Sequence, residues 1–157
     1  MGTFDYTPQI YKNSKTHCHQ VAMLGVYLGR ASVRAGMKQW SPGGEGGAEL
    51  EFAEKMPGLT DEIQVTTDLG TYVTVARRKG ADWYVASMSG RQATSYPYPL
   101  SFLAAGRTYR ASIYSDSPGG RKAVHSQQQV TSQTVLPIAM EPNGGHLMIL
   151  EPAGGSR

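Results

Sequence analysis

The sequence predicts a mainly β protein, an antiparallel β-sandwich of about eight strands preceded by an amphipathic helix. Two observations predict the sandwich: short runs rich in Val, Ile, Thr and Tyr occupy the chain from residue 63 onward, and turn-forming residues separate them. A third predicts the helix, because apolar residues between positions 15 and 34 recur with a helical period. The chain therefore divides into a helical N-terminal part and a β-rich remainder.

The clearest pair of predicted strands lies between residues 68 and 88. Both arms of this hairpin, 71–77 and 82–88, show the alternation of a half-buried strand, and a short turn containing glycine separates them. Each arm has one face for a core and another for solvent or a second layer. Trp83 and Tyr84 lie inside the second arm, so we expect both side chains to belong to the core.

The other strands follow the same pattern. Pro97 and Pro99 predict an edge or irregular strand, because proline cannot donate to a β-ladder. Two alternating rows are predicted to face the core: one holds Tyr109, Ala111 and Ile113, and the other holds Leu136, Ile138 and Met140. The eight predicted strands are 63–67, 71–77, 82–88, 93–100, 107–114, 123–130, 134–140 and 145–150.

The N-terminal part is predicted to contain a helix from about Lys15 to Arg34, with Asn13 or Ser14 as its N-cap. Its internal glycines each cost about 1 kcal/mol relative to alanine, so we expect the helix to need a surface on which to pack. A stretch at 41–47 has the composition of a flexible linker, and residues 48–56 are predicted to form a short helical turn.

The composition of the chain excludes several classes of structure and of binding partner. The single cysteine, Cys18, excludes an intramolecular disulfide, and the net charge of +3 is scattered rather than clustered as nucleic-acid binding requires. No apolar run approaches the ~20 residues of a membrane helix, and the N-terminus has no signal-peptide pattern. We expect neither a nucleic-acid nor a membrane partner, and the cellular compartment stays unknown.

Three blocks carry a resemblance to a known family: GTYVTVARRKGADWYVASM, PLSFLAAGRTYRASIYSD and VTSQTVLPIAMEPNGGHLMILEPA. Their order and spacing resemble the C-terminal β-sandwich of glycoside hydrolase family 97, which comprises bacterial retaining and inverting α-glucosidases and α-galactosidases. FDYTP at 4–8 and THCHQVAMLGVYL at 16–28 resemble the end of that family's catalytic (β/α)8 barrel. The resemblance divides the chain into 1–56, a remnant of the last barrel strand and helix plus a Gly-rich linker, and 57–157, the C-terminal sandwich domain.

The resemblance also implies what this chain lacks. In the family, the catalytic carboxylates and the calcium ligands precede the DYTP segment, so no catalytic, cofactor-binding or metal-binding residue is carried over to this sequence. Calcium is expected only in full-length members, and relatives are often periplasmic or secreted. The chain departs from the family at Thr60, which stands where a tryptophan is usual. Whether the chain belongs to a working enzyme stays open.

The residues themselves offer few chemical candidates. Neighbouring carboxylates on an extended chain point apart, which disfavours Asp61 and Glu62 as a glycosidase pair. His17 and His19 project roughly 200° apart on a helix and cannot chelate one ion together. The remaining candidates are aromatic residues beside prolines or loops, whose rings could cover a sugar face: Trp40, Tyr96 and Tyr98.

The favoured hypothesis is a noncatalytic portion of a family 97 α-glycosidase that packs against and stabilises the catalytic barrel and contributes to oligomerisation. Two alternatives remain open. One is a free-standing carbohydrate-binding module that binds α-glucan or another carbohydrate. The other is a self-associating domain that buries the amphipathic helix against a second copy.

Overall fold

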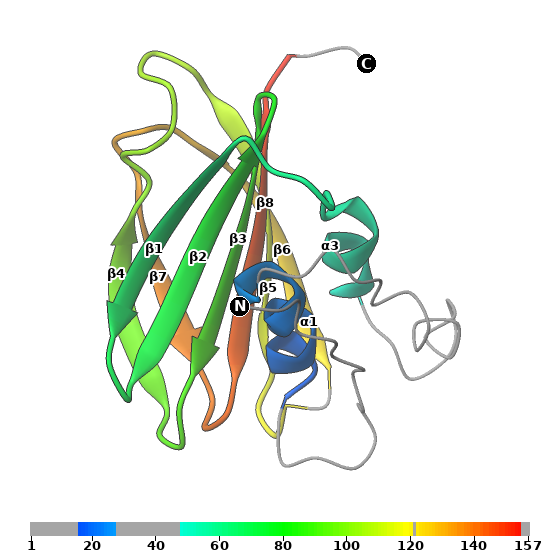
Figure 1. Ribbon diagram of the computed structural model, residues 1–157, viewed down its shortest axis with the longest axis vertical. Helices are drawn as coiled ribbons and strands as arrows, with labels where there is room; N and C mark the ends of the chain where they lie inside the picture. Colours follow the sequence, from blue (N-terminus) through cyan, green and yellow to red (C-terminus); the bar gives the residue numbers. More distant parts are fainter. Residues whose placement is uncertain (1–15, 28–47, 121, 155–157) are drawn as a thin grey trace.

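The computed structural model describes residues 16–27, 48–120 and 122–154. Eight strands form two antiparallel sheets, one with the order β1-β2-β3-β8-β5-β6 and one in which β4 pairs with β7 (Figure 1). The strands are β1 (Glu62–Asp68), β2 (Tyr72–Lys79), β3 (Asp82–Ser89), β4 (Thr94–Pro99), β5 (Tyr109–Asp116), β6 (Ala123–Val130), β7 (Val135–Met140) and β8 (Gly145–Pro152).

All eight predicted strands are confirmed. The β2–β3 hairpin pairs Val75 with Ala86, and its turn has Gly80 at a φ of 60°, a conformation that favours glycine. Pro97 lies opposite Pro137, and within the described residues β4 pairs only with β7, as expected for a proline-containing edge strand.

The first hydrophobic core lies between the two sheets. Both predicted rows of core residues belong to it, with Ile113 partly buried and the other five buried. Trp83 is also buried in this core, at 3 % exposure. The inner face of the six-stranded sheet is therefore covered by the β4–β7 ribbon. The alternating rows of apolar residues that predicted a sandwich point into this core.

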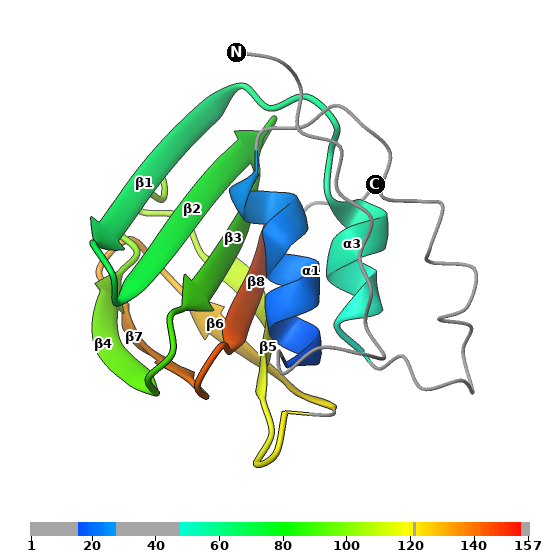
Figure 2. The ribbon, with the colours of Figure 1, turned by 60° about the horizontal axis from the view of Figure 1, so that its bottom comes forward.

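A second core lies on the other face of the six-stranded sheet, where α1 (His17–Val26) and α3 (Leu50–Lys55) pack (Figure 2). Tyr84 and Ala86 of β3 and Leu147 and Ile149 of β8 point into it. Strands β3 and β8 are thus buried on both faces, which explains why β8 is a nearly continuous apolar run.

The first helix begins and ends differently from the prediction. Its N-cap is Thr16, whose side chain accepts a hydrogen bond from the backbone of His19, so the expected cap at Asn13 or Ser14 is wrong. The continuation to Arg34 is also wrong at Tyr27, where the backbone is extended with ψ of 132°. Residues 28–34 lie outside the described part of the chain. The short helical turn predicted at 48–56 is confirmed as α3.

Glycine lets α1 approach the sheet closely. A Cβ atom added at Gly25 would lie 2.4 Å from the Cβ of Ala86 and 3.4 Å from the ring of Phe52. The glycine that weakens the isolated helix is therefore what allows the folded helix to pack. Neither described helix has the length and apolar character of a membrane span.

We predict that Gly25→Ala destabilises the protein by about 1–3 kcal/mol, the usual cost of overpacking, although alanine is the better helix former by about 1 kcal/mol. Urea denaturation followed by circular dichroism measures the change. Gly58→Ala is the matched control, since nothing lies within 4 Å of its added Cβ. A more stable Gly25→Ala variant would contradict the close packing.

Candidate functional site

The surface that holds α1 is the most elaborately built site in the described structure. Backbone hydrogen bonds fix the start of the helix to two turns: Thr16 N donates to Asn143 O at 3.2 Å, and His17 N donates to Gly120 O at 3.0 Å. The ring of His19 is buried, and its Nδ1 lies 2.9 Å from Gly144 O. Three polar groups at the start of the helix, from Thr16, His17 and His19, thus bond to the sandwich.

Two consecutive glycines, Gly144 and Gly145, lie in the turn next to the start of α1. A Cβ atom at Gly145 would lie 2.3 Å from the backbone nitrogen of His19 and 2.4 Å from the carbonyl carbon of Cys18. At Gly144, a Cβ would lie 2.2 Å from the carboxylate of Asp116. Gly145 therefore makes room for the helix, and Gly144 makes room for Asp116 and for the backbone of Glu141 within the turn between β7 and β8.

The partly buried carboxylate of Asp116 completes this clamp on the helix. Asp116 Oδ2 accepts hydrogen bonds from the backbone nitrogens of Gly145 at 2.9 Å and Glu141 at 3.1 Å. Burial is the main reason that the pKa of Asp116 is raised above its usual value. Burial, and next the nearby charge of Asp116, also raise the pKa of the Cys18 thiol. Cys18 is therefore a packing residue and a poor nucleophile.

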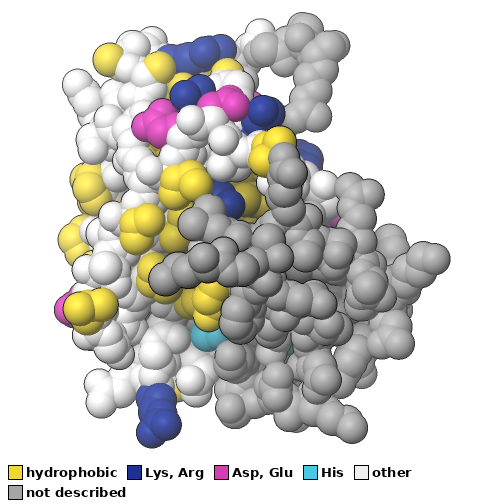
Figure 3. All heavy atoms as spheres, in the orientation of Figure 1, with side chains coloured by type: hydrophobic (Ala, Val, Ile, Leu, Met, Phe, Trp, Pro, Cys, Tyr) yellow, Lys and Arg dark blue, Asp and Glu magenta, His cyan; other side chains and the backbone are white. Residues whose placement is uncertain are grey.

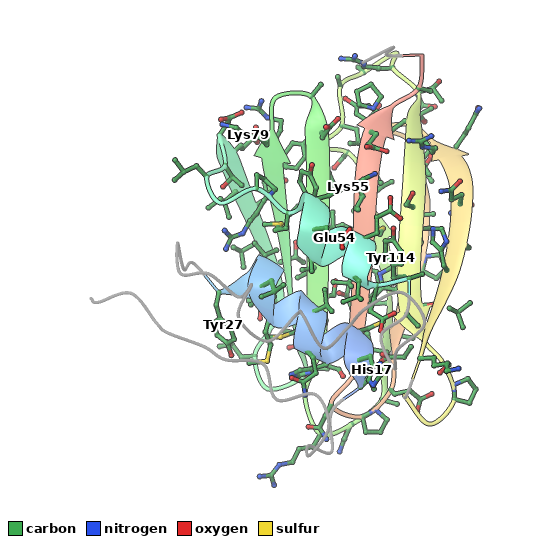
Figure 4. The ribbon with its side chains drawn as sticks, turned by 90° about the vertical axis from the view of Figure 1, so that its right-hand side faces the viewer. His17, Tyr27, Glu54, Lys55, Lys79 and Tyr114 are labelled. Atoms are coloured by element: carbon green, nitrogen blue, oxygen red, sulfur yellow. The ribbon has the colours of Figure 1, made fainter. Side chains whose placement is uncertain are left out.

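The other end of α1 is also tied to the sheet. Arg77 of β2 is 6 % exposed, and its Nη2 donates to the carbonyl of Val26 at 3.4 Å. Burial lowers the pKa of Arg77. A cation near the last carbonyls of a helix also complements the helix dipole. In Figure 4, His17 and Tyr27 mark the two ends of the helix where it lies across the sheet.

Charged groups fasten α3 beside α1. Lys55 Nζ lies 2.8 Å from Glu51 on the same helix and 3.3 Å from Glu151 on β8, and Glu151 in turn pairs with Arg110 at 2.6 Å. Tyr114 donates a hydrogen bond to Glu51. The bond from Lys55 is the main reason that the pKa of Glu51 is lowered. These partly exposed pairs orient α3 more than they stabilise it.

The predicted sugar platforms do not form one surface in the described structure. Tyr98 is 4 % exposed and belongs to the core between the sheets, so its ring has no face free for a sugar. Tyr96 is stacked on Tyr72 with centroids 3.8 Å apart, and its hydroxyl bonds to Thr74. Trp40 lies outside the described residues. Tyr98 was misjudged because the strand containing prolines turns this ring inward.

The adjacent carboxylates Asp61 and Glu62 have structural partners. Asp61 accepts a hydrogen bond from Gly80 N at 2.7 Å and pairs with Lys79 at 3.1 Å, while Glu62 pairs with Arg78 at 3.0 Å. The bond from Gly80 is the largest cause of the lowered pKa of Asp61. A glycosidase acid needs a raised pKa, so the electrostatics here favour a stabilised turn.

No group of three or more His, Cys, Asp or Glu residues suited to a metal ion occurs within 16–27, 48–120 and 122–154. His17 instead pairs with Glu49 at 3.2 Å, while His19 bonds to the Gly144 carbonyl. The two rings therefore bond to different partners, as expected for side chains that project in different directions from a helix.

Sequence reasoning did not identify a hollow of about 320 Å³ at the end of the sheet where β2 and β3 meet. Arg78 lies 6.0 Å from the ring of Trp83, and Arg107 lies 5.9 Å from the ring of Tyr109. Phe102 also lines the hollow. The two arginines lie over aromatic rings that are almost completely buried, so the hollow combines arginine side chains with a mainly apolar lining.

Exposed apolar side chains occur at the C-terminal end of α1 and along β1 as far as the β1–β2 turn. Ile63 lies opposite Arg77 in the β1–β2 ladder, so it shares the helix-side face with Arg77, and Val65 lies two residues further on the same face. Figure 3 shows apolar side chains on this part of the surface. We call this set the apolar strip: Tyr27 (42 % exposed), Ile63 (42 %), Val65 (61 %) and Leu69 (91 %).

A family model described as "Glycosyl-hydrolase 97 C-terminal, oligomerisation" matches residues 60–151. The chain belongs to this family. Family 97 membership agrees with the predicted resemblance. The matched residues span all eight strands, except for the last residue of β8, Pro152.

Longer proteins contain the same fold. The retaining alpha-galactosidase of Bacteroides thetaiotaomicron is 27 % identical over 99 residues, which are 60 % of this chain and 15 % of that protein. The structure of a family 97 enzyme from Pseudoalteromonas sp. strain K8 in complex with panose is similar with a TM-score of 0.79 and 20 % identity, covering 96 % of this chain and 26 % of that chain. A beta-arabinopyranosidase structure has a TM-score of 0.66 and 22 % identity, covering 87 % and 21 %. The chain thus spans about a quarter or less of these relatives.

We predict that Gly145→Ala loosens α1, because the added methyl group collides with the backbone of Cys18 and His19. Cys18 is the only cysteine and is 1 % exposed, so its reaction with Ellman's reagent reports helix undocking. We expect the reaction to accelerate at least ~10-fold, equivalent to about 1.4 kcal/mol of docking free energy. Gly58→Ala should react as slowly as the unchanged chain. Equal rates for all three proteins would contradict the clamp.

We also predict that His146 stays neutral in the folded protein down to acidic pH, because burial lowers its pKa to about 4 from an ordinary 6.5. The unfolded chain binds this proton first, so the contribution of His146 to stability is complete above about pH 6.5 and is lost as the pH falls towards 4. The loss amounts to about 2–3 kcal/mol between pH 7.5 and 4.5.

The NMR titration of the His146 imidazole is the deciding measurement, since the raised pKa of Asp116 affects stability in the opposite sense. A midpoint near pH 4 is expected. A midpoint near 6.5 would mean that the side chain is open to water.

Proposed function

We propose that this chain is the noncatalytic assembly portion of a family 97 α-glycosidase, in which the sandwich holds the helix that joins it to a preceding catalytic barrel. The observation that carries the proposal is the attachment of α1 at both ends, by the Gly144–Gly145 turn and by Arg77. A helix clamped in this way transmits the position of the sandwich to whatever chain the helix continues from.

The apolar strip supports the same role. A soluble surface rarely concentrates large apolar side chains beside a helix terminus unless a partner covers them. The relatives are several times longer than this chain, which leaves ample protein to do so. The catalytic barrel is the proposed occupant, and it lies against β1, β2 and the end of α1.

The burial of α1 bears on the alternative of helix-mediated self-association. Residues Cys18, Val21, Ala22 and Met23 pack with the chain's own sheet in the second core. A second copy is therefore not needed to bury this face. Oligomerisation, the role in the family's description, requires another surface.

The activity of the parent enzyme is part of the proposal. We expect hydrolysis of α-linked galactosides or glucosides, with calcium held by the barrel, and the likeness to a retaining alpha-galactosidase supports this substrate class. Within this chain, Asp61, Glu62, Glu51 and Glu151 hold turns and helices through ion pairs. They are occupied as structural groups, which supports a noncatalytic role.

Carbohydrate binding is the second candidate. The hollow near Trp83 and Phe102 favours it, because aromatic edges and arginine donors together suit a sugar. Trp40 remains the other predicted platform. Retarded migration in a gel containing starch, abolished by Trp40→Ala or by Arg107→Ala, would support this function over the assembly role.

The noncatalytic role predicts no turnover of 4-nitrophenyl α-glucoside or α-galactoside by the purified 157-residue chain, with or without calcium. Hydrolysis that disappears on Asp61→Asn or Glu62→Gln would overturn it. Both residues are substantially exposed, so these variants should remain folded and give a clear answer.

The docking role is tested on the protein encoded by the reading frame that continues upstream of Met1. If the frame encodes a barrel, Val65→Asp should lower the melting temperature of the joined protein by several degrees and leave that of the 157-residue chain unchanged. Val135→Asp is the matched control, being 55 % exposed on β7, away from the strip. An upstream frame without a barrel, or equal effects of both variants, would refute the docking role.

A further inference from the structure

Strand β6 presents an open side along the edge of the larger sheet. All eight of its residues pair with β5, and within the described residues no strand pairs with its other side. Residues 124–129 are exposed. In Figure 4, which faces the helix-covered side, β6 forms one margin of the sheet and β1 forms the opposite margin. The outer backbone groups of β6 are therefore available for hydrogen bonds to another strand.

This edge lacks the features that usually prevent strand pairing. The sequence of β6, AVHSQQQV, contains no Lys, Arg, Asp, Glu or Pro. The opposite edge is different, because β1 begins at Glu62 and ends at Asp68, and Glu62 belongs to a charged group with Arg78. Soluble proteins protect exposed edges with charges, prolines or bulges. The sheet therefore has one protected edge and one unprotected edge.

The unprotected strand is also held in place before any partner arrives. The ring of His125 stacks on Tyr114 with centroids 4.8 Å apart and planes 10° apart. Gln127 Nε2 donates to Ser112 Oγ at 3.2 Å. Both contacts join β6 to β5 at its centre, so little conformational entropy remains to be lost when a further strand is added.

The strand is complementary to itself in an antiparallel arrangement. With a two-fold axis through Ser126, each Ser126 lies opposite its own copy, His125 lies opposite Gln127 and Val124 lies opposite Gln128. No like charges meet, and glutamine side chains can both donate and accept hydrogen bonds across the pair. In the same arrangement, β1 would bring Glu62 opposite Asp68 of the other copy, which is repulsive.

We propose that β6 is the self-association edge of this domain, and that two copies pair their β6 strands antiparallel to join their six-stranded sheets into one. The inference rests on the assembly role proposed above and names the partner as a second copy. A two-fold interface suits this occupant because the same uncharged segment serves both sides. The apolar strip lies at the β1 side of the sheet, so this contact and barrel docking use separate surfaces.

Sedimentation equilibrium of the 157-residue chain tests the pairing. We expect a dimer whose dissociation constant rises at least ~10-fold in Ser126→Lys, because the two introduced lysines lie directly opposite each other at the two-fold axis. Thr66→Lys adds the same charge to the middle of the exposed β1 edge and is the matched control. Its dissociation constant should stay within about two-fold of the unchanged chain.

A proximity measurement gives an independent result. Ser126→Cys should be linked into a covalent dimer by a short bis-maleimide reagent, whereas Thr66→Cys should not, and Cys18 is too buried to react. A monomeric chain at about 100 µM, or a dimer weakened equally by both lysine variants, would overturn the edge pairing. Neither outcome affects the result of the barrel-docking test with Val65→Asp. A failure of the β6 pairing can therefore be distinguished from a failure of the assembly role.

Discussion

The close approach of α1 to the six-stranded sheet is the constraint on which the rest of the structure depends. It requires Gly25 against Ala86 and Gly145 against the backbone of Cys18, since a single methyl group at either glycine would overlap its neighbour. Asp116 fixes the turn that holds the second glycine. Because protein interiors are packed as densely as organic crystals, these two positions tolerate almost no side chain larger than that of glycine. The helix is therefore an integral layer of the domain.

Covering both faces of the central strands leaves the sheet margins as surfaces for assembly. The helices lie over β3 and β8, and the β4–β7 ribbon covers the opposite face, so β3 and β8 are almost entirely buried while the marginal strands β1 and β6 are largely exposed. The two margins differ chemically: β1 combines charges at its ends with exposed Ile63 and Val65, and β6 is uncharged and polar. One domain can thus serve a catalytic barrel and a second copy without competition between them.

Strands such as β5 and β7 were predictable because each buries one face and therefore carries a regular alternation. The division into six strands and two was not, because β4 and β7 alternate as clearly as β5 does, and alternation does not specify a partner. Tyr98 illustrates the limit: its neighbouring prolines suggested a surface loop, yet the register opposite Leu136 turns it into the core. The C-terminal end of α1 was missed for a similar reason, since a contact with Arg77 from a distant strand meets the helix there.

By itself the sequence determined the β-rich class, the eight strands, the helix at the N-terminal side and the family, because these depend on local periodicity and on motifs within short segments. Only the tertiary structure decided that the turn at Gly144 and Gly145 contacts the start of α1, and that the partly buried Asp116 holds this turn through hydrogen bonds. It also decided which edge of the sheet is unprotected. These features depend on contacts between residues that are far apart in the sequence, such as His19 and Gly144, which are 125 positions apart. A local sequence pattern does not predict such contacts.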